Sequence, residues 1–220
     1  MLDPSEFDPI KLKMILSGEK KLCVFDLDQT LMHPYLDDSE KGEQKIRKEF
    51  EDGKYCEIGF NLRPYFHEVL TKLKDLMVCI VFTASEKIYA DIVINHIDPK
   101  NEYFTHRLYR NKCIKIEKTD LEFPFYVKDL RIFTSLNINL KDIILIDNSI
   151  LSFSYQINNG IPILSYYDNK EDRELLYLLK HLTYLANAYD IRIEIQNLFR
   201  LHECIKPSQL KKMYPSDDDE

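Results

Sequence analysis

The stretch "KLCVFDLDQT" (residues 21–30) decides the fold, because an apolar run leads directly into two aspartates, Asp26 and Asp28. A short, continuous apolar run predicts a strand that is buried on both faces, as in a parallel sheet. The spacing of two places both carboxylates on the same side of an extended chain. Two unit charges at ~4 Å repel by roughly 4 kcal/mol at an effective dielectric near 20. The pair therefore predicts that one carboxyl is protonated or that a cation lies between them.

Three further apolar runs predict strands of the same kind, namely "MVCIVF" (77–82), "DIILID" (142–147) and "IPIL" (161–164). Helical patterns separate or follow these strands, at 64–76, at 86–96, after the "DNS" of 147–149 and at 171–188. Strands and helices in alternation predict an α/β fold, an open parallel sheet with helices on both faces.

Polar side chains follow three of the predicted strands at the point where each strand ends. These residues are Asp26, Thr83 and Asp147. Open α/β sheets bind their ligands at the carboxyl ends of the strands. The sequence therefore predicts a polar site that three distant segments build together.

The composition sets further bounds on function. The chain has 220 residues, 45% of them hydrophobic and 30% charged, which is typical of one globular domain. A formal net charge of −7 argues against direct nucleic-acid binding. Five widely spaced cysteines without a C-x-x-C pair indicate reduced thiols, and no apolar run is long enough to predict a membrane span.

We expect one central domain over 21–203, preceded by an N-terminal extension (1–20) and followed by an acidic tail (204–220). Two insertions interrupt it, at about 32–61 and 99–127. The first is highly charged and predicts a hairpin or short flap. Neither insertion is large enough for a separate cap domain, so the fold is expected to be capless, with the strand edge open to a bulky partner.

Each polar motif has an ordinary structural interpretation when it is taken alone. Thr83 and Ser85 suit a helix N-cap, Lys128 suits the surface, and Asp147 with Asn148 suits another cap. The functional alternative is an anion site at the helix start and a Mg²⁺ site of hard oxygen ligands beside it. Four such motifs in order favour the functional alternative.

Several segments together resemble the haloacid dehalogenase superfamily, and more narrowly the phosphatases of the RNA polymerase II C-terminal-domain type, also called SCP-like or NLI-interacting-factor-like. The resemblance covers roughly residues 20 to 200. The segments that carry it are "FDLDQTLMH", "LRPY", "FTASEKIYADIV", "RLYRNKCI", "YVKDL", "ILIDNS" and "SYYDNKEDRELLYLL".

The resemblance implies a magnesium-dependent protein phosphatase that hydrolyses phosphoserine or phosphothreonine through an aspartyl-phosphate. It makes Asp26 the nucleophile and Asp28 the acid and base. Thr30 would orient the loop, while Thr83 and Lys128 would hold the phosphoryl oxygens.

For the substrate and the metal, the resemblance implies a second group of residues. Arg110 would contact the substrate phosphate, with Ser85 and Tyr89 also in the substrate site. Mg²⁺ would be bound by Asp26, by the backbone carbonyl of Asp28 and by Asn148, with Asp147 close by through water.

Four positions depart from the family pattern. Gln29 and Ile150 replace a usual glutamate and proline, and we expect them to touch no catalytic group. Glu86 replaces an apolar residue of the substrate's proline pocket, and Leu36 replaces an aromatic one near it. The last two leave the specific substrate open.

Residues 103–126 form an aromatic and basic segment with two interpretations. They form either a small hydrophobic cluster or a shelf for an extended proline-containing peptide. The aromatic residues are Tyr103, Phe104, Tyr109, Phe123, Phe125 and Tyr126, and the basic residues are Arg107, Arg110, Lys112, Lys115 and Lys118. The basic residues favour a phosphorylated peptide over a neutral metabolite.

The expected partner is a phosphorylated protein or peptide, first of all the C-terminal repeat tail of RNA polymerase II, and the expected location is the nucleus, with the cytoplasm as alternative. No nucleic-acid or membrane partner is expected, and the oligomeric state is left open. The alternatives are a phosphatase of another phosphoprotein and a catalytically silent adaptor that binds phosphopeptides.

Overall fold

Five parallel strands form the centre of the molecule, as a computed structural model shows for residues 1–35, 38–50, 53–117 and 124–204. The order across the sheet is β10 (Gly160–Pro162), β9 (Ile143–Asp147), β1 (Lys21–Phe25), β5 (Met77–Phe82) and β6 (Phe104–Leu108). Every neighbouring pair is parallel. The four predicted strands are confirmed, and so is the α/β class.

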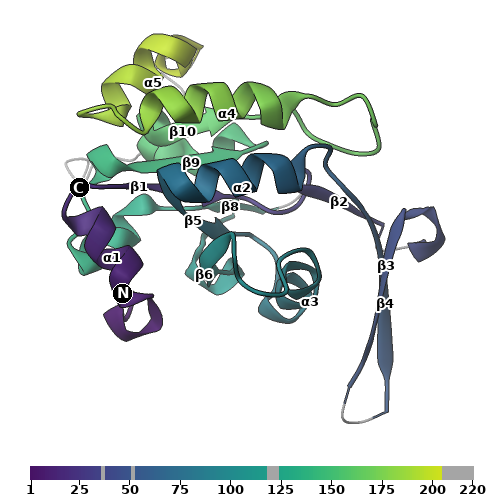
Figure 1. The fold of residues 1–220 in the computed structure, drawn as a ribbon. Coiled ribbons are helices and arrows are strands. Elements are labelled where there is room, and N and C mark those ends of the chain that lie inside the picture. The colour runs from purple at the N-terminus through teal and green to yellow at the C-terminus, as the bar shows by residue number, and fades with distance from the viewer. Residues whose placement is uncertain (36–37, 51–52, 118–123, 205–220) are drawn as a thin grey trace.

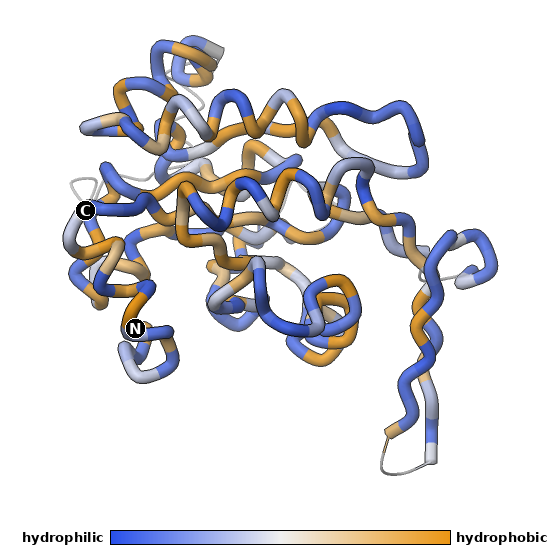
Figure 2. The backbone as a smooth tube through the Cα atoms, in the orientation of Figure 1, coloured by the Kyte–Doolittle hydropathy of each residue, from blue (hydrophilic) through white to orange (hydrophobic). Residues whose placement is uncertain are grey.

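Helices cover both faces of this sheet (Figure 1). One core lies under α2 (Phe66–Leu76), α3 (Lys87–Ile97), α4 (Glu174–Leu185) and α5 (Ile191–Phe199). The other core lies under α1 (Pro9–Leu16), η4 (Leu130–Leu136) and η6 (Ile150–Asn159). Figure 2 shows apolar residues along the sheet strands, where the continuous runs predicted them.

Helical spacing explains which face each long helix buries. In α4 the buried residues are Leu175, Leu178, Leu182 and Leu185, and in α2 they are Phe66, Val69, Leu70 and Leu73. Residues three or four apart lie on one face of a helix, so each set forms a single apolar stripe. The two stripes meet the same core, and α2 packs against α4.

Strand β6 lies at the edge of the sheet and was not predicted, because its sequence "FTHRL" has three polar residues between Phe104 and Leu108 and so lacks a continuous apolar run. It lies inside the segment 99–127 that was expected to be an insertion. Asp98 turns the chain into it by accepting hydrogen bonds from the backbone N–H groups of Glu102, Tyr103 and Phe104. Helices α1 and α5 were also not predicted, and the helix expected after "DNS" is the kinked 3₁₀ element η6.

The charged segment 32–61 forms a three-stranded antiparallel sheet in the order β2 (Met32–Tyr35), β4 (Tyr55–Leu62) and β3 (Gln44–Glu49). The expected hairpin is confirmed, and its β3–β4 end projects from the body of the molecule (Figure 1). Most side chains of the edge strand β3 are exposed. Leu36 lies outside the described residues.

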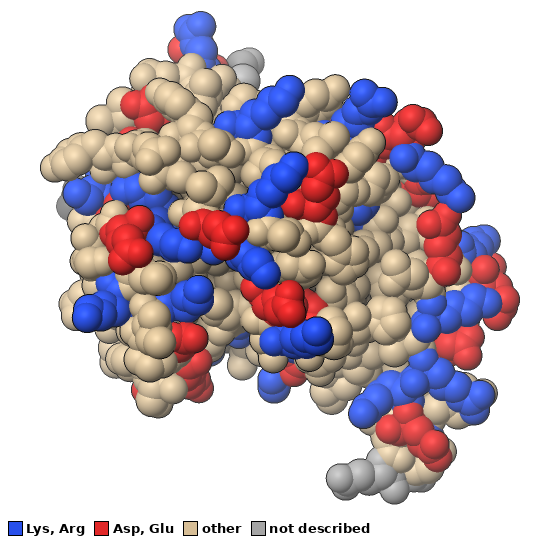
Figure 3. Space-filling view, viewed as in Figure 1, with Lys and Arg blue, Asp and Glu red and all other residues tan. Residues whose placement is uncertain are grey.

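The remaining short elements connect these layers. They are η1 (Pro4–Glu6), η2 (Ser39–Lys41), η3 (Arg110–Lys112), η5 (Leu140–Asp142), β7 (Ile114–Ile116), β8 (Phe125–Val127) and α6 (Leu201–Cys204). Within the described part of the chain, no helix has the length and apolar character needed to cross a bilayer. Figure 3 shows acidic and basic side chains interspersed over the face in view, without a large basic patch.

A buried arginine joins three segments behind the strand edge. Arg63 is 1% exposed and donates to the backbone carbonyls of Thr30 (2.9 Å) and Leu164 (2.8 Å). It also makes two hydrogen bonds to the carboxylate of Asp172, at 2.9 and 2.8 Å. Such a two-point contact fixes both partners in one geometry. The "LRPY" motif therefore holds the loop after β1 against residues 164–172.

Replacing Arg63 with alanine is expected to lower the free energy of unfolding by about 3–5 kcal/mol, because the mostly buried Asp172 carboxylate and the carbonyls of Thr30 and Leu164 would lose their partner. Urea denaturation measures the loss. The control is Lys72→Ala, which breaks an exposed ion pair with Glu68 and costs about 0.5 kcal/mol or less. A loss below about 1 kcal/mol for Arg63→Ala would contradict this role.

Candidate active site

The predicted polar residues meet at the carboxyl ends of β1, β5 and β9. A cavity of about 650 Å³ opens there. Its lining includes Asp26 and Asp28, Gln29, Pro34, Thr83, Ala84, Ser85, Glu86, Tyr89, Arg110, Tyr126, Lys128, Asp147, Asn148, Ser149 and Ser152. Every predicted site residue except Thr30 therefore lines one cavity, and Thr30 lies directly behind it.

Lys128 provides the cation that the acidic cluster requires. Its Nζ lies 2.6 Å from Asp26 Oδ1 and 2.6 Å from Asp147 Oδ2, and the residue is 1% exposed. The lysine follows β8, so it enters the site from outside the main sheet. The sequence predicted a cation beside these carboxylates, but assigned Lys128 to the phosphoryl group. In the structure its ammonium contacts the two carboxylates.

The shared ammonium changes the acidity of the groups around it. Burial raises the pKa of Asp26 to about 7, Lys128 opposes the rise, and Asp147 and Asp28 add to it. Burial alone would lower the pKa of Lys128, but Asp147 and Asp26 outweigh it and leave that pKa above its ordinary value. Lys128 therefore remains charged at neutral pH, and the site holds more negative charge than one lysine neutralises.

Asp28 has a separate set of partners made of hydroxyl groups. Its Oδ2 accepts a hydrogen bond from Ser85 Oγ at 2.6 Å and lies 3.5 Å from Thr83 Oγ1. Its Oδ1 accepts from the Tyr89 hydroxyl at 2.6 Å. Burial and the neighbouring Asp28 charge raise the pKa of Tyr89, which therefore stays a donor. The two aspartates of one motif thus occupy different environments, one ionic and one hydroxyl-lined.

Thr30 links the loop after β1 to the loop after β9. Its hydroxyl donates to Asp26 Oδ2 at 3.0 Å and accepts from the backbone N–H of Asn148 at 3.3 Å. The Asn148 amide nitrogen donates to Ser165 Oγ (3.0 Å) and Gln29 Oε1 (3.1 Å). Gln29 was expected to touch no catalytic group, and its contact here is with Asn148, one of the predicted metal ligands. Gln29 has a left-handed backbone (φ 63°), which the sequence did not indicate.

The oxygen donors fit a hard divalent cation, although no three His, Cys, Asp or Glu side chains are grouped as metal ligands in the described ranges. The Asn148 Nδ2 group donates hydrogen bonds to Gln29 and Ser165, and this fixes the direction in which its Oδ1 points. That oxygen lies 3.5 Å from Thr30 Oγ1. Thr30 contacts Asp26 Oδ2 from the same hydroxyl. One carboxylate and one amide oxygen, completed by backbone and water, is a ligand set that Mg²⁺ accepts.

Arg110 lies at the cavity wall but is held by the protein. Its Nε donates to the carbonyl of Ala84 at 2.5 Å, and its Nη1 donates to Glu86 Oε1 at 2.9 Å. Its guanidinium also lies over the ring of Tyr126, 5.3 Å from the centroid. Glu86 is therefore a partner of the arginine that was expected to contact phosphate.

The aromatic segment divides between the two predicted interpretations. Phe104 is buried in the core and Tyr103 packs on Phe66 of α2, as a hydrophobic cluster would. Tyr126 instead lines the cavity. Phe123 and Lys118 lie outside the described residues.

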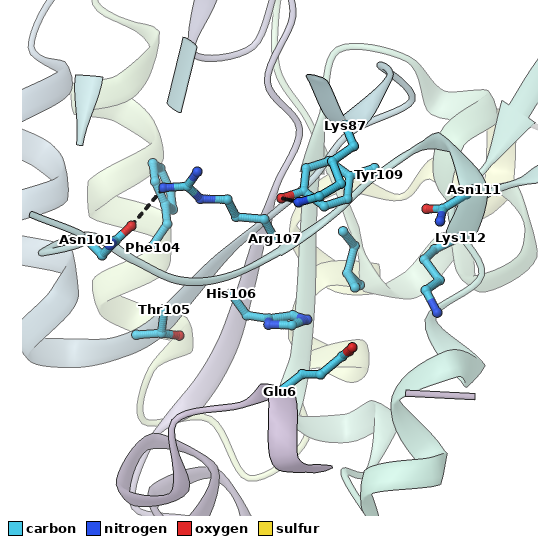
Figure 4. A pocket seen from close by; sticks show the side chains of 11 residues that line it. Glu6, Lys87, Asn101, Phe104, Thr105, His106, Arg107, Tyr109, Asn111 and Lys112 are labelled. Carbon is cyan, nitrogen blue, oxygen red and sulfur yellow. Dashed lines mark hydrogen bonds between the residues drawn. The ribbon is translucent and has the colours of Figure 1, made fainter. Parts of the chain in front are cut away.

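A second hollow, of about 580 Å³, lies along β6 (Figure 4). Two of its three Lys and Arg residues already have internal partners. Arg107 donates to Asp91, Asn95 and Asn101, and Lys87 donates to Asp91. It has no aspartate pair of the kind found at the strand ends. The chemistry belongs to the first cavity.

The family model described as NLI interacting factor-like phosphatase matches residues 21–192. The chain belongs to this family. In this NLI interacting factor-like chain, the matched range contains every residue that lines the cavity and all five strands of the central sheet.

Several relatives share this range. The chain is 37% identical to CTD small phosphatase-like protein 2 of Dictyostelium discoideum, over 86% of this chain and 31% of the relative. It is 33% identical to CTD small phosphatase-like protein 3 of Caenorhabditis elegans, over 90% of this chain and 64% of the relative. It is also 33% identical to the human carboxy-terminal domain RNA polymerase II polypeptide A small phosphatase 1, over 78% and 62%.

The chain therefore spans less than two thirds of the length of each of these relatives. Among solved structures, the fission yeast RNA polymerase II CTD phosphatase Fcp1 bound to beryllium fluoride superposes with a TM-score of 0.54 at 18% identity. That superposition covers 93% of this chain and 57% of the other. At that identity the likeness shows the shared fold of the family.

Replacing Lys128 with methionine is expected to lower the free energy of unfolding by about 3 kcal/mol or more, because Asp26 and Asp147 would face each other without a cation. Chemical denaturation at neutral pH without divalent metal measures this. The matched control, Lys115→Met, removes an exposed lysine that pairs with Glu117 and should leave stability nearly unchanged.

The double variant Lys128→Met/Asp26→Asn separates charge from packing. It should recover part of the lost stability, because only one of the two carboxylates remains. If the double variant is less stable than Lys128→Met alone, the electrostatic explanation is wrong.

Proposed function

We propose that this chain is a magnesium-dependent protein phosphatase that hydrolyses phosphoserine or phosphothreonine through an aspartyl-phosphate on Asp26. The observation that carries the proposal is that the two aspartates have different hydrogen-bonding partners. Asp26 is held by Lys128 and Thr30, while Asp28 is held by Ser85 and Tyr89. Two carboxyl groups in different environments suit two different roles, nucleophile and proton carrier.

In the first step, an oxygen of the Asp26 carboxylate attacks phosphorus as the bond from phosphorus to the serine oxygen breaks. Protonated Asp28 gives its proton to the departing serine alkoxide. Lys128 and Thr83 stabilise the negative charge on the phosphoryl oxygens, since an ammonium and a hydroxyl both donate hydrogen bonds. Thr30 keeps the second Asp26 oxygen engaged and so fixes the direction of attack.

In the second step, water attacks the phosphorus of the aspartyl-phosphate, and Asp28 now accepts the proton of that water. The bond between phosphorus and the Asp26 oxygen breaks, which releases inorganic phosphate and restores the carboxylate. Tyr89 and Ser85 hold the Asp28 carboxylate in position, since each donates to one of its oxygens, and the Ser85 hydroxyl can accept from Asp28 when Asp28 carries its proton.

Asp26, Asn148 and the backbone carbonyl of Asp28 are the proposed ligands of Mg²⁺, with Asp147 close by. When bound, the ion would neutralise charge on the transferred phosphoryl group. The oxygen donors around Thr30 support this assignment, and so does the excess of carboxylates over lysine in the site.

For the substrate we propose a phosphorylated protein or peptide, with the C-terminal repeat tail of RNA polymerase II as the first candidate and the nucleus as the location. The names of the human small phosphatase and of fission yeast Fcp1, both phosphatases of the RNA polymerase II C-terminal domain, support this choice. A phosphatase of a different phosphoprotein is the second candidate, and the charged pair of Glu86 with Arg110 at the cavity favours it. We further propose that residues 21–203 form the phosphatase domain, between the extension 1–20 and the tail 204–220.

Asp26→Asn is expected to reduce phosphate release from phosphoserine peptides to background, because an amide oxygen is a poor nucleophile. The peptide panel includes repeat-tail heptads phosphorylated at either serine, and released phosphate is quantified. Asp75→Asn, an exposed position on α2, is the matched control and should keep full turnover. Phosphate release by Asp26→Asn above background would remove the proposed mechanism.

Removing divalent metal with EDTA is expected to abolish turnover, and adding Mg²⁺ back should restore it. Mg²⁺ should also raise the thermal midpoint of the metal-free protein, since a ligand at 100 times its Kd stabilises by about 2.7 kcal/mol. Asn148→Leu should lose the thermal shift. Turnover that survives thorough chelation would rule out the metal site.

A further inference from the structure

The pair of Glu86 and Arg110 has a position that the proposed chemistry does not explain. Both residues line the cavity, and Arg110 Nη1 donates to Glu86 Oε1 at 2.9 Å. The Glu86 side chain is 70% exposed, so its carboxylate is open to solvent and to a bound peptide. A charged group at the mouth of a site affects which charges may enter beside the reacting group.

Local structure shows that Glu86 does not serve its own helix. It is the N-cap residue of α3, yet its side chain makes no capping hydrogen bond. Ser, Thr, Asp or Asn would suit that position better, because their shorter side chains reach the free amides of the first turn. The Glu86 carboxylate extends to Arg110 instead.

Arg110 is positioned for an anion but shares its charge with Glu86. The carbonyl of Ala84 fixes its Nε, and the ring of Tyr126 lies beside the guanidinium. A substrate phosphate in the cavity competes with Glu86 for this arginine, because both are anions that accept from the same fork of donors. Once the phosphate takes Arg110, the Glu86 carboxylate is left without its cation.

The charge of the whole cavity also favours a substrate with a positive side chain near Glu86. Its lining holds the acidic residues Asp26, Asp28, Glu86 and Asp147, against the cations Lys128 and Arg110. A phosphoserine adds about two more negative charges at neutral pH. A substrate that also brings a positive side chain to the mouth compensates Glu86, whereas one with an acidic neighbour adds repulsion.

We propose that Glu86 is a specificity-determining residue that selects phosphopeptides with a lysine or arginine next to the phosphorylated residue. This inference rests on the proposed phosphatase function and names its substrate class. The phosphate binds Arg110, and the released Glu86 carboxylate pairs with the basic side chain of the peptide. Two ion pairs with the peptide thus replace the internal pair of Glu86 and Arg110.

The test uses one phosphoserine peptide in which each flanking position in turn carries lysine, alanine or glutamate. Dissociation constants are measured by fluorescence anisotropy with the Asp26→Asn protein, which retains the cavity but not the nucleophile. Turnover of the same peptides is measured with the wild type. At the position that faces Glu86, lysine should bind about fivefold tighter than alanine, as expected of a partly exposed ion pair, and glutamate should bind more weakly.

Variants of Glu86 distinguish recognition from general damage to the fold. Glu86→Gln should remove the preference for lysine, and should tighten binding of the alanine peptide because Arg110 is freed for phosphate. Glu86→Lys should reverse the preference, so that the glutamate peptide binds best. Glu68→Gln, which disrupts an exposed ion pair on α2, is the control and should keep the wild-type order.

The outcomes separate this inference from the proposed function. Turnover of all peptides with no dependence on flanking charge, or the same preference in Glu86→Lys as in the wild type, overturns the role of Glu86 alone. No turnover of any peptide or of a small aryl phosphate, with the charge preference intact in binding, overturns the phosphatase function and supports Glu86 as a recognition residue. Absence of both overturns both.

Discussion

One ammonium group between two buried carboxylates is the interaction on which the site depends. Lys128 lies 2.6 Å from both Asp26 and Asp147, and these come from β1 and β9, neighbouring strands that are far apart in the chain. Without the lysine, the closing of the sheet would bring like charges together in a region shielded from water, where repulsion is strong. The active-site geometry and the assembly of the sheet edge are thus linked through a single side chain.

Around that pair, the polypeptide fixes each functional group through a neighbour from another segment. Arg63 anchors the loop of Thr30, Thr30 contacts Asp26, and Ser165 with Gln29 orients Asn148. These contacts form before any substrate arrives, so little reorganisation is left for the reaction itself. Preorganised dipoles of this kind are the main source of electrostatic stabilisation in enzymes.

The sequence predicted the fold correctly where a pattern, such as a short continuous apolar run, is compatible with only one kind of element. The continuous apolar runs identified four of the five strands, and their terminal polar residues identified the edge at which the site lies. Strand β6 escaped because edge strands carry polar residues and resemble loops. Only the two ends of "FTHRL" are apolar and buried, so neither a continuous run nor an alternation marked this strand.

Within the site, the types of residue were predictable but several contacts were not. Spacing cannot show that the Lys128 ammonium turns toward the carboxylates, or that Gln29 takes a left-handed backbone and so reaches Asn148. The partnership of Glu86 and Arg110 joins a helix start to a 3₁₀ turn more than twenty residues later, and only the folded chain brings them together. Long-range side-chain pairs of this kind are set by packing.

The projecting β3–β4 hairpin affects how the protein can associate with other copies at high protein concentration. Its outer strand offers unpaired backbone groups along one side, which is where a strand from another molecule could add. The sequence of that strand, "QKIRKE", has one apolar residue, Ile46, between the long charged side chains of Lys45 and Arg47. Stacking a second copy in register would bring these like charges together and strip them of water. Charged side chains on the exposed strand therefore oppose edge-to-edge pairing of the projecting arm.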